Sequence, residues 1–160
     1  MTPAEPDEIV REVDIAATPA DVFPYFVDAQ KLRAWKAVAA EADARPGGRF
    51  RMDITGQGVV AIGSYLVIEP PHRVVFTWEW EGDDQPGRKP GVVEVTFSPN
   101  AQGTRLRLVH RGVDSQRRAG SAKGWTHYLE RLALVAGGRD AGPDPWAASA
   151  SMELSQRRQP

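Results

Sequence analysis

Among the side chains that could carry acid–base chemistry, His110 has the most informative position. It follows Leu106 and Leu108 in an alternating apolar pattern, so its side chain is expected to point into the protein. An imidazole has a reference pKa of about 6.5, which suits a general acid or base near neutral pH. No nucleophile is visible beside it in the sequence. The pattern therefore favours a structural histidine, hydrogen-bonded near the start of the next helix, with a catalytic His110 as the alternative.

Metal and cofactor chemistry is not indicated by the sequence. The chain has no cysteine, and His72, His110 and His127 lie on three different predicted elements without metal-ligand spacing. The glycines at 47–48 and 56–58 lack the lysine pattern of a phosphate-binding loop and open no helix. We therefore expect neither a metal nor a cofactor.

The composition is that of a globular protein with no excess of either charge. The chain has 160 residues and a net charge of −1, which argues against a nucleic-acid partner. No apolar run approaches the length of a membrane span, so stable membrane insertion is not expected. Residues 1–8 are acidic and lack the basic and apolar regions of a signal peptide, which predicts a cytoplasmic protein.

The elements that position His110 can be read from alternation and helix caps. Residues 9–15 predict a strand, after which Thr18 is placed to cap a helix with Pro19 in its first turn. Asp28 is placed to cap a second short helix that runs to Trp35. About six antiparallel strands follow between residues 38 and 111.

The last regular element is a long amphipathic helix. It is expected to begin between residues 115 and 121, to carry its apolar face on Trp125 and its three- and four-residue neighbours, and to end at 137–138. The chain then divides into a flexible start (1–8), one domain (9–137) and a tail rich in Gly, Pro, Ala and Ser (138–160). Trp146 in this tail either folds back over the domain or mediates a homodimer, and a helix within 147–154 is an option.

The order strand, two helices, six strands, helix resembles the SRPBCC superfamily (START-like, Bet v 1-like). Within it, the chain is similar to bacterial relatives of the activator of heat-shock protein 90 ATPase. The motifs that carry the resemblance are these: TPADVF at 18–23, LRAW at 32–35, PGGRF at 46–50, EPPHRVVFTW at 69–78, HRG at 110–112 and GW at 124–125. The loop 112–123 lacks the acidic character of relatives, and the tail after Gly138 is not part of the family pattern.

The resemblance implies an α+β helix-grip fold. In this fold a curved antiparallel sheet of six to seven strands wraps around a long C-terminal helix, and the sheet and the helix enclose an apolar cavity. Aromatic side chains dominate the candidate lining. An ordinary filled core is the competing interpretation for each of them. The predicted ligand-binding residues are Trp35, Phe50, Met52, Tyr65, Trp78, Trp80, Val95, His110, Trp125, Tyr128, Leu129 and Leu132.

Three functions are compatible with this fold, because one scaffold can host unrelated activities. The first is binding of a small hydrophobic or aromatic molecule, such as a lipid, polyketide or metabolite. The second is a polyketide cyclase or dehydratase in the same cavity, with His110 as acid or base and Tyr65 or Tyr128 polarising a carbonyl. The third is a co-chaperone role with the heat-shock protein 90 ATPase, although no second interaction module is visible.

Overall fold

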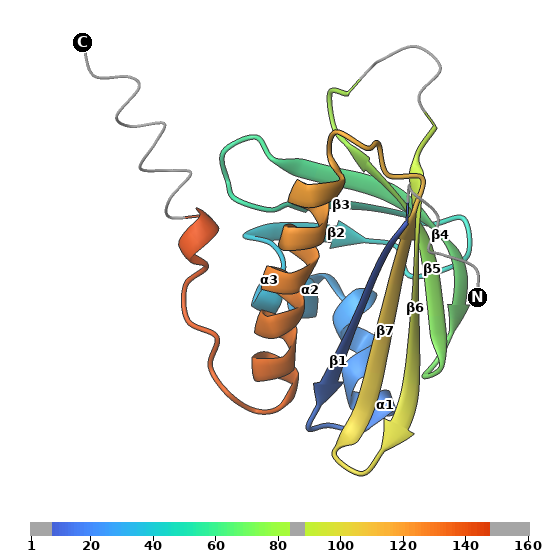
Figure 1. Cartoon of the computed structure of the whole chain (residues 1–160), viewed down its shortest axis with the longest axis vertical. Helices are drawn as coiled ribbons and strands as arrows, with labels where there is room; N and C mark the ends of the chain where they lie inside the picture. The colour runs from blue at the N-terminus through green and yellow to red at the C-terminus, as the bar shows by residue number, and fades with distance from the viewer. Residues whose placement is uncertain (1–7, 84–88, 148–160) are drawn as a thin grey trace.

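The computed structural model describes residues 8–83 and 89–147, and its element order agrees with the sequence-based expectation (Figure 1). Most of the predicted flexible start (residues 1–7), and all but the first residue of the stretch 147–154 where a helix was an option, lie outside the described part. The elements are β1 (Ile9–Ile15), α1 (Pro19–Val22), a 3-10 turn η1 (Phe23–Phe26), α2 (Ala29–Trp35), β2 (Ala39–Ala42), β3 (Arg49–Asp53), β4 (Val60–Glu69), β5 (Arg73–Trp80), β6 (Gly91–Asn100), β7 (Gly103–Arg111) and α3 (Arg118–Ala136).

Both short helices begin where the sequence places their caps. The Oγ1 atom of Thr18 accepts a hydrogen bond from the Asp21 amide at 3.3 Å. The carboxylate of Asp28 accepts from the amides of Gln30 and Lys31 at 2.8 and 3.3 Å. These bonds satisfy amides that have no partner within the helix. They fix the start of α2, whose last turn reaches the functional site.

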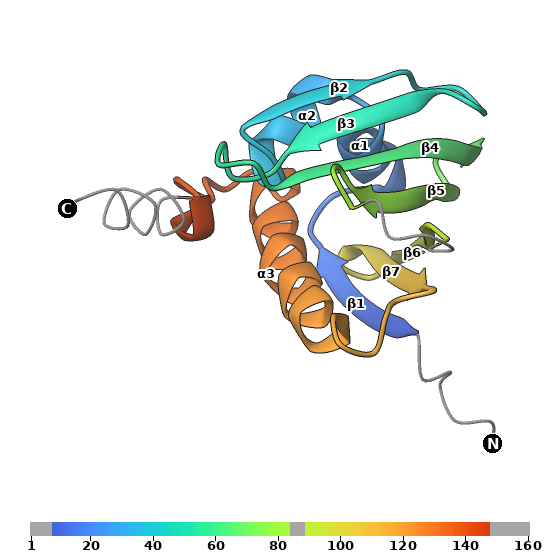
Figure 2. The ribbon, with the colours of Figure 1, turned by 90° about the horizontal axis from the view of Figure 1, so that it is seen from above.

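The seven strands form one antiparallel sheet in the order β1-β7-β6-β5-β4-β3-β2. The sheet is curved, and α3 crosses the open side between β1 and the β2–β3 edge (Figure 2). The pairing of β4 with β5 shifts register between Tyr65 and Val67. This irregularity places Tyr65 in the core at 1% exposure and leaves Leu66 48% exposed. Tyr65 therefore points inward, as its place in the predicted lining requires.

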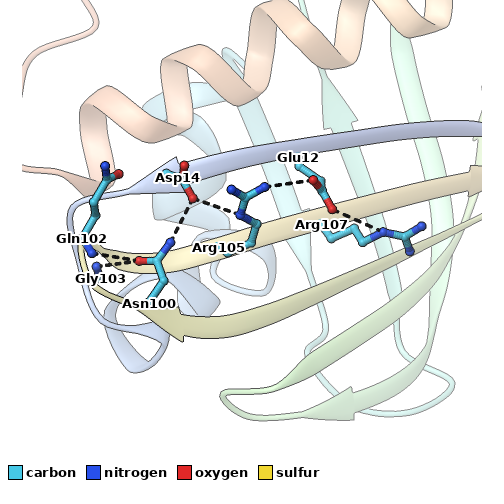
Figure 3. Close-up of polar contacts among 7 residues, drawn as sticks. All are labelled: Glu12, Asp14, Asn100, Gln102, Gly103, Arg105 and Arg107. Atoms are coloured by element: carbon cyan, nitrogen blue, oxygen red, sulfur yellow. Dashed lines mark hydrogen bonds and ion pairs between the residues drawn. The ribbon is translucent and has the colours of Figure 1, made fainter.

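The outer face of β1 and β7 carries a ladder of ion pairs (Figure 3). Glu12 contacts Arg105 at 2.9 Å and Arg107 at 3.6 Å, and Asp14 contacts Arg105 at 3.1 Å. The Asn100 amide donates to Asp14 at 2.9 Å. All these groups are partly exposed, and each such pair contributes at most about 1 kcal/mol to stability. These polar side chains cover the solvent-facing side of β1 and β7, and the opposite side of the two strands packs against the core.

Helix α3 holds the sheet through one apolar side. Trp125, Tyr128, Leu129 and Leu132 are each no more than 3% exposed. Full burial of a large apolar side chain stabilises a fold by roughly 1.5–3 kcal/mol. None of the helices within the described residues combines the length and apolar character needed to cross a membrane.

Beyond α3 the chain turns back along the same helix (Figure 1). We call residues 139–147 the C-terminal segment. Arg131 of α3 donates to the carbonyls of Ala141 and Gly142 in this segment at 3.3 and 3.0 Å. The same guanidinium donates to the Trp35 carbonyl at 3.2 Å. Arg131 thus joins α2, α3 and the C-terminal segment at one point.

Candidate functional site

The interior between sheet and helix is tightly packed around the residues of the predicted lining, and the void among them is small. The apolar void there measures about 10 Å³, close to the space that one water molecule requires. It is closed by large aromatic rings: Trp78 lies 5.1 Å from Trp125, and Phe50 lies 5.5 Å from both Tyr65 and Phe76. The bulk of these rings is the physical reason that this void is small.

Space for a ligand lies instead at an open groove beside the first half of α3. We call it the aromatic groove, and its volume is about 340 Å³. Small-molecule sites typically measure about 300–1,000 Å³. The groove is lined by Lys36, Ile54, Thr55, Val59, Trp78, Trp80, Gln116, Arg117, Gly120, Ser121, Gly124, Trp125, Tyr128 and Trp146.

Eleven of the twelve predicted lining residues fall into three overlapping groups in the structure, and the twelfth, His110, lines a neighbouring depression. Four of them line the aromatic groove: Trp78, Trp80, Trp125 and Tyr128. Six border the small interior void: Trp35, Phe50, Met52, Tyr65, Trp78 and Trp125. Val95, Leu129 and Leu132 pack in the hydrophobic core and line neither space. The last three are packed as core residues at the place where helix and sheet meet.

His110 acts on the groove through Trp125. The indole Nε1 of Trp125 donates to Nδ1 of His110 at 3.0 Å, which leaves the ring proton of a neutral imidazole on Nε2. Burial, with a smaller contribution from the positive charge of Lys36, lowers the pKa of His110 to about 4. His110 is therefore neutral at physiological pH. This geometry is that of the structural histidine in the sequence analysis, and it fixes the plane of a groove-lining ring.

Sequence reasoning missed Lys36, the most unusual polar group of the site. Lys36 follows the last residue of α2 and is only 5% exposed. Its Nζ lies 4.0 Å from the ring centroid of Tyr128, 4.7 Å from Trp125 and 5.1 Å from Trp78. An ammonium group within about 6 Å of an aromatic face is attracted to the ring. The three rings form an aromatic cage around the amine.

The electrostatic state of Lys36 follows from this burial. Desolvation lowers its pKa from 10.5 to about 7, and the carboxylate of Asp144 offsets part of that change. Near neutral pH the side chain is thus divided between ammonium and amine. Within residues 8–83 and 89–147, no hydrogen bond or ion pair joins its Nζ to an acceptor. The Nζ atom is not among the fully buried polar atoms that lack a partner, so it keeps contact with solvent at the open groove. Lys36 contributes to both the interior void and the aromatic groove.

The C-terminal segment provides the outer wall of the groove. The carboxylate of Asp144 accepts from the Tyr128 hydroxyl at 2.6 Å and contacts Nε2 of His127 at 2.8 Å. Trp146 stacks on the His127 ring and lines the aromatic groove. Burial alone would raise the pKa of Asp144, but hydrogen bonds from Tyr128, His127 and the Trp146 amide hold it below the usual value. Of the two roles predicted for Trp146, the structure shows the fold-back over the domain.

Two other depressions lie beside the groove, and both differ from it in character. One of about 420 Å³ has polar and apolar walls in equal measure and includes His110, Lys89 and Asp114. The other, of about 770 Å³, is broad and lies between α2 and the C-terminal segment. In the described part of the chain, no three His, Asp or Glu side chains gather as metal ligands would.

Comparison with known proteins places this architecture in a family. Residues 16–137 match the family model described as "Activator of Hsp90 ATPase homolog 1-like protein". The match stops at the end of α3, so the C-terminal segment lies beyond it. Among proteins with curated functions, none is significantly similar to this chain.

Solved structures of bacterial proteins have the same fold. The solution structure of an AHSA1-like protein from Rhizobium etli is 39% identical over 87% of each chain, with a TM-score of 0.67. A crystal structure from Mesorhizobium loti is 26% identical, covering 78% of this chain and 93% of that one, with a TM-score of 0.68. CalU16 from Micromonospora echinospora is 25% identical, covering 94% of this chain and 84% of its own, with a TM-score of 0.67.

Proposed function

Because this chain belongs to the family of Activator of Hsp90 ATPase homolog 1-like proteins, whose fold is typical of ligand-binding domains, we propose that it binds a small aromatic or hydrophobic molecule. The ligand lies in the aromatic groove and not inside the sheet. The observation that carries the proposal is the convergence of four tryptophans, Trp78, Trp80, Trp125 and Trp146, on one open space of about 340 Å³.

Flat apolar walls at this site favour an aromatic ligand. Indole and phenol rings offer a large contact area with little loss of side-chain freedom, and offset or edge-to-face ring contacts add about 0.5–1.5 kcal/mol per pair. The Trp78 and Trp80 rings already lie 5.7 Å apart at an angle of 78°. Since Trp125 is held by His110, the groove has a preformed wall and the ligand does not have to order it.

Ligand binding requires no catalytic step from His110. Its Nδ1 is occupied by Trp125 and its pKa is about 4, so it is a weak base at neutral pH. Binding therefore accounts for the arrangement of His110 better than acid–base catalysis does.

The experiment uses N-phenyl-1-naphthylamine, a neutral aromatic probe whose emission rises in apolar surroundings. We expect saturable binding, quenching of tryptophan emission and an increase in Tm with probe concentration. Gly124 lines the groove, and a Cβ built there lies 3.9 Å from the Trp146 ring. Gly124→Leu is expected to fill the groove and weaken binding about tenfold or more, whereas Gly124→Ala, the matched control, leaves most of the space open. Absence of binding to the native chain, or equal binding by Gly124→Leu, contradicts the proposal.

A further inference from the structure

Lys36 places a cation at the inner end of the aromatic groove, where an apolar ligand alone would leave it without an acceptor. Its side chain is largely buried and lines the groove, its Nζ keeps contact with solvent there, and no acceptor of the protein contacts Nζ within the described residues. A ligand that fills the groove would remove this solvent. Buried charged groups are normally paired, because an unpaired charge away from water is costly. The aromatic cage compensates only part of this cost, since a ring face attracts the ammonium without accepting a full hydrogen bond.

The neighbouring carboxylate does not fill the role of partner. Asp144 is engaged by the Tyr128 hydroxyl, the His127 ring and the Trp146 amide. The ring of Tyr128 contacts Lys36 while its hydroxyl bonds to Asp144. Asp144 therefore acts on Lys36 through its field, and no bond joins the two.

The other cation that lines the groove is already paired. Arg117 contacts Asp83 at 2.7 Å and is 43% exposed at its side chain. Arg117 can retain water and its carboxylate partner when a ligand binds. Lys36 is distinguished from it by deep burial and by the missing acceptor.

We propose that the ligand of the aromatic groove is an aromatic acid, whose anionic group pairs with the ammonium of Lys36 while its rings contact the tryptophans. This inference rests on the proposed function and specifies its ligand class. A carboxylate, sulfonate or acidic phenolate would provide the acceptor that the protein does not. The aromatic cage then surrounds an ion pair, and the adjoining rings exclude water from it.

Binding of an anion also couples to the protonation of Lys36. The groups that face Lys36 are Asp144 from the C-terminal segment, His110 from β7 and Tyr128 from α3. Between about pH 6 and pH 9 Asp144 stays ionised and His110 neutral, and the pKa of Tyr128 is raised by burial above this range. Lys36 is thus the one of these four whose charge changes in the interval, and the anion is bound best at the acidic end.

The test compares two probes with the same aromatic skeleton. Anilinonaphthalene-8-sulfonate carries an anionic group, and N-phenyl-1-naphthylamine does not. We expect Lys36→Met to weaken binding of the sulfonate about tenfold or more, with little change for the neutral probe. Lys123→Met removes the same charge from an exposed position outside the groove and should leave both affinities unchanged.

A measurement on the native chain makes the test independent of any variant. The affinity for the sulfonate is expected to fall about tenfold from pH 6 to pH 9, while that of the neutral probe stays constant. If the neutral probe binds and the sulfonate shows neither the Lys36→Met effect nor the pH effect, the inference is wrong and the proposed function stands. If neither probe binds the native chain, the proposed function itself fails.

Discussion

The indole of Trp146 lies flat against the imidazole of His127, with 4.1 Å between the ring centroids and 1° between the ring planes. Together with the bonds to Asp144, this stack holds the C-terminal segment against α3. The segment closes one side of the aromatic groove although it lies beyond the part of the chain that matches the family model. A few side-chain contacts therefore determine the shape of the site.

Removal of the Asp144 carboxylate should release the C-terminal segment. In Asp144→Ala the Tyr128 hydroxyl and the His127 ring lose their acceptor, and hydrogen bonds to a charged group are worth about 1.5–3 kcal/mol each. We expect faster hydrogen exchange in residues 139–147 and weaker binding of the neutral probe. The free energy of global unfolding should change by less than about 1 kcal/mol, because the segment can detach while the sheet stays folded.

Acid should have the same effect on the native chain. The pKa of Asp144 is held below its usual value in the folded protein. Its carboxylate therefore stabilises the docked C-terminal segment at pH values above the pKa that Asp144 has in the unfolded chain. This stabilisation is lost as the pH falls through the pKa that Asp144 has in the folded chain. Glu130→Ala, an exposed change on α3, is the matched control. Unchanged exchange protection in Asp144→Ala would show that other contacts hold the segment.

Replacement of Lys36 by Met is expected to stabilise the protein. The pKa of Lys36 is about 7 in the folded chain and about 10.4 in the unfolded one, so the folded state binds fewer protons between these values. The contribution of Lys36 to stability is therefore most favourable above pH 10 and is lost as the pH falls towards 7. Urea unfolding should show Lys36→Met more stable by roughly 1–3 kcal/mol at pH 6, with the difference narrowing as the pH rises.

If the difference in the free energy of unfolding between Lys36→Met and the native chain stayed constant over this pH range, the lowered pKa of Lys36 would be contradicted. Lys123→Met again provides the control for charge. A residue whose removal improves stability while weakening anion binding is typical of a functional site, where stability is sacrificed for activity.

His110 should make the protein sensitive to acid. Burial and the charge of Lys36 lower its pKa from 6.5 to about 4, so the folded state binds fewer protons than the unfolded state in this interval. The neutral His110 therefore contributes fully to the stability of the fold above pH 6.5. This contribution is lost as the pH falls from 6.5 through 4, which lowers the free energy of unfolding by roughly 2–3 kcal/mol. His110→Asn keeps an acceptor near Trp125 but does not titrate, and we expect a flatter Tm profile over this range.

The same substitution at His72, an exposed histidine in the turn between β4 and β5, should leave the acid dependence of Tm unchanged. If His110→Asn follows the native profile, protonation of His110 does not determine acid stability. Its place beside Trp125 would then serve packing alone.

Most of the fold could be predicted because its signals are local. Thr18 and Asp28 cap the helices that they were expected to cap, and α3 ends at Ala136 with Gly137 as its C-cap, as the glycine pair predicts. Alternation identified the inward face of β7, including His110. Each of these signals depends on residues within a few positions of one another.

The site was less predictable because its partners are distant in the sequence. Lys36 belongs to no periodic pattern, and its cage combines Trp78 from β5 with Trp125 and Tyr128 from α3. The size of the interior void depends on how large rings fit together, and spacing along the chain does not specify that. The residues that were expected to point inward are mostly buried, and four of them line the aromatic groove.

The contribution of Trp146 to the groove has an evolutionary consequence. The C-terminal segment, which carries Trp146, contacts side chains on the surface of α3 and contributes no strand to the sheet. Mutations, insertions or deletions after α3 can thus alter which molecules fit while the folded scaffold is preserved. Homologous chains with different endings would be expected to differ in selectivity, even where their strands and helices superimpose closely.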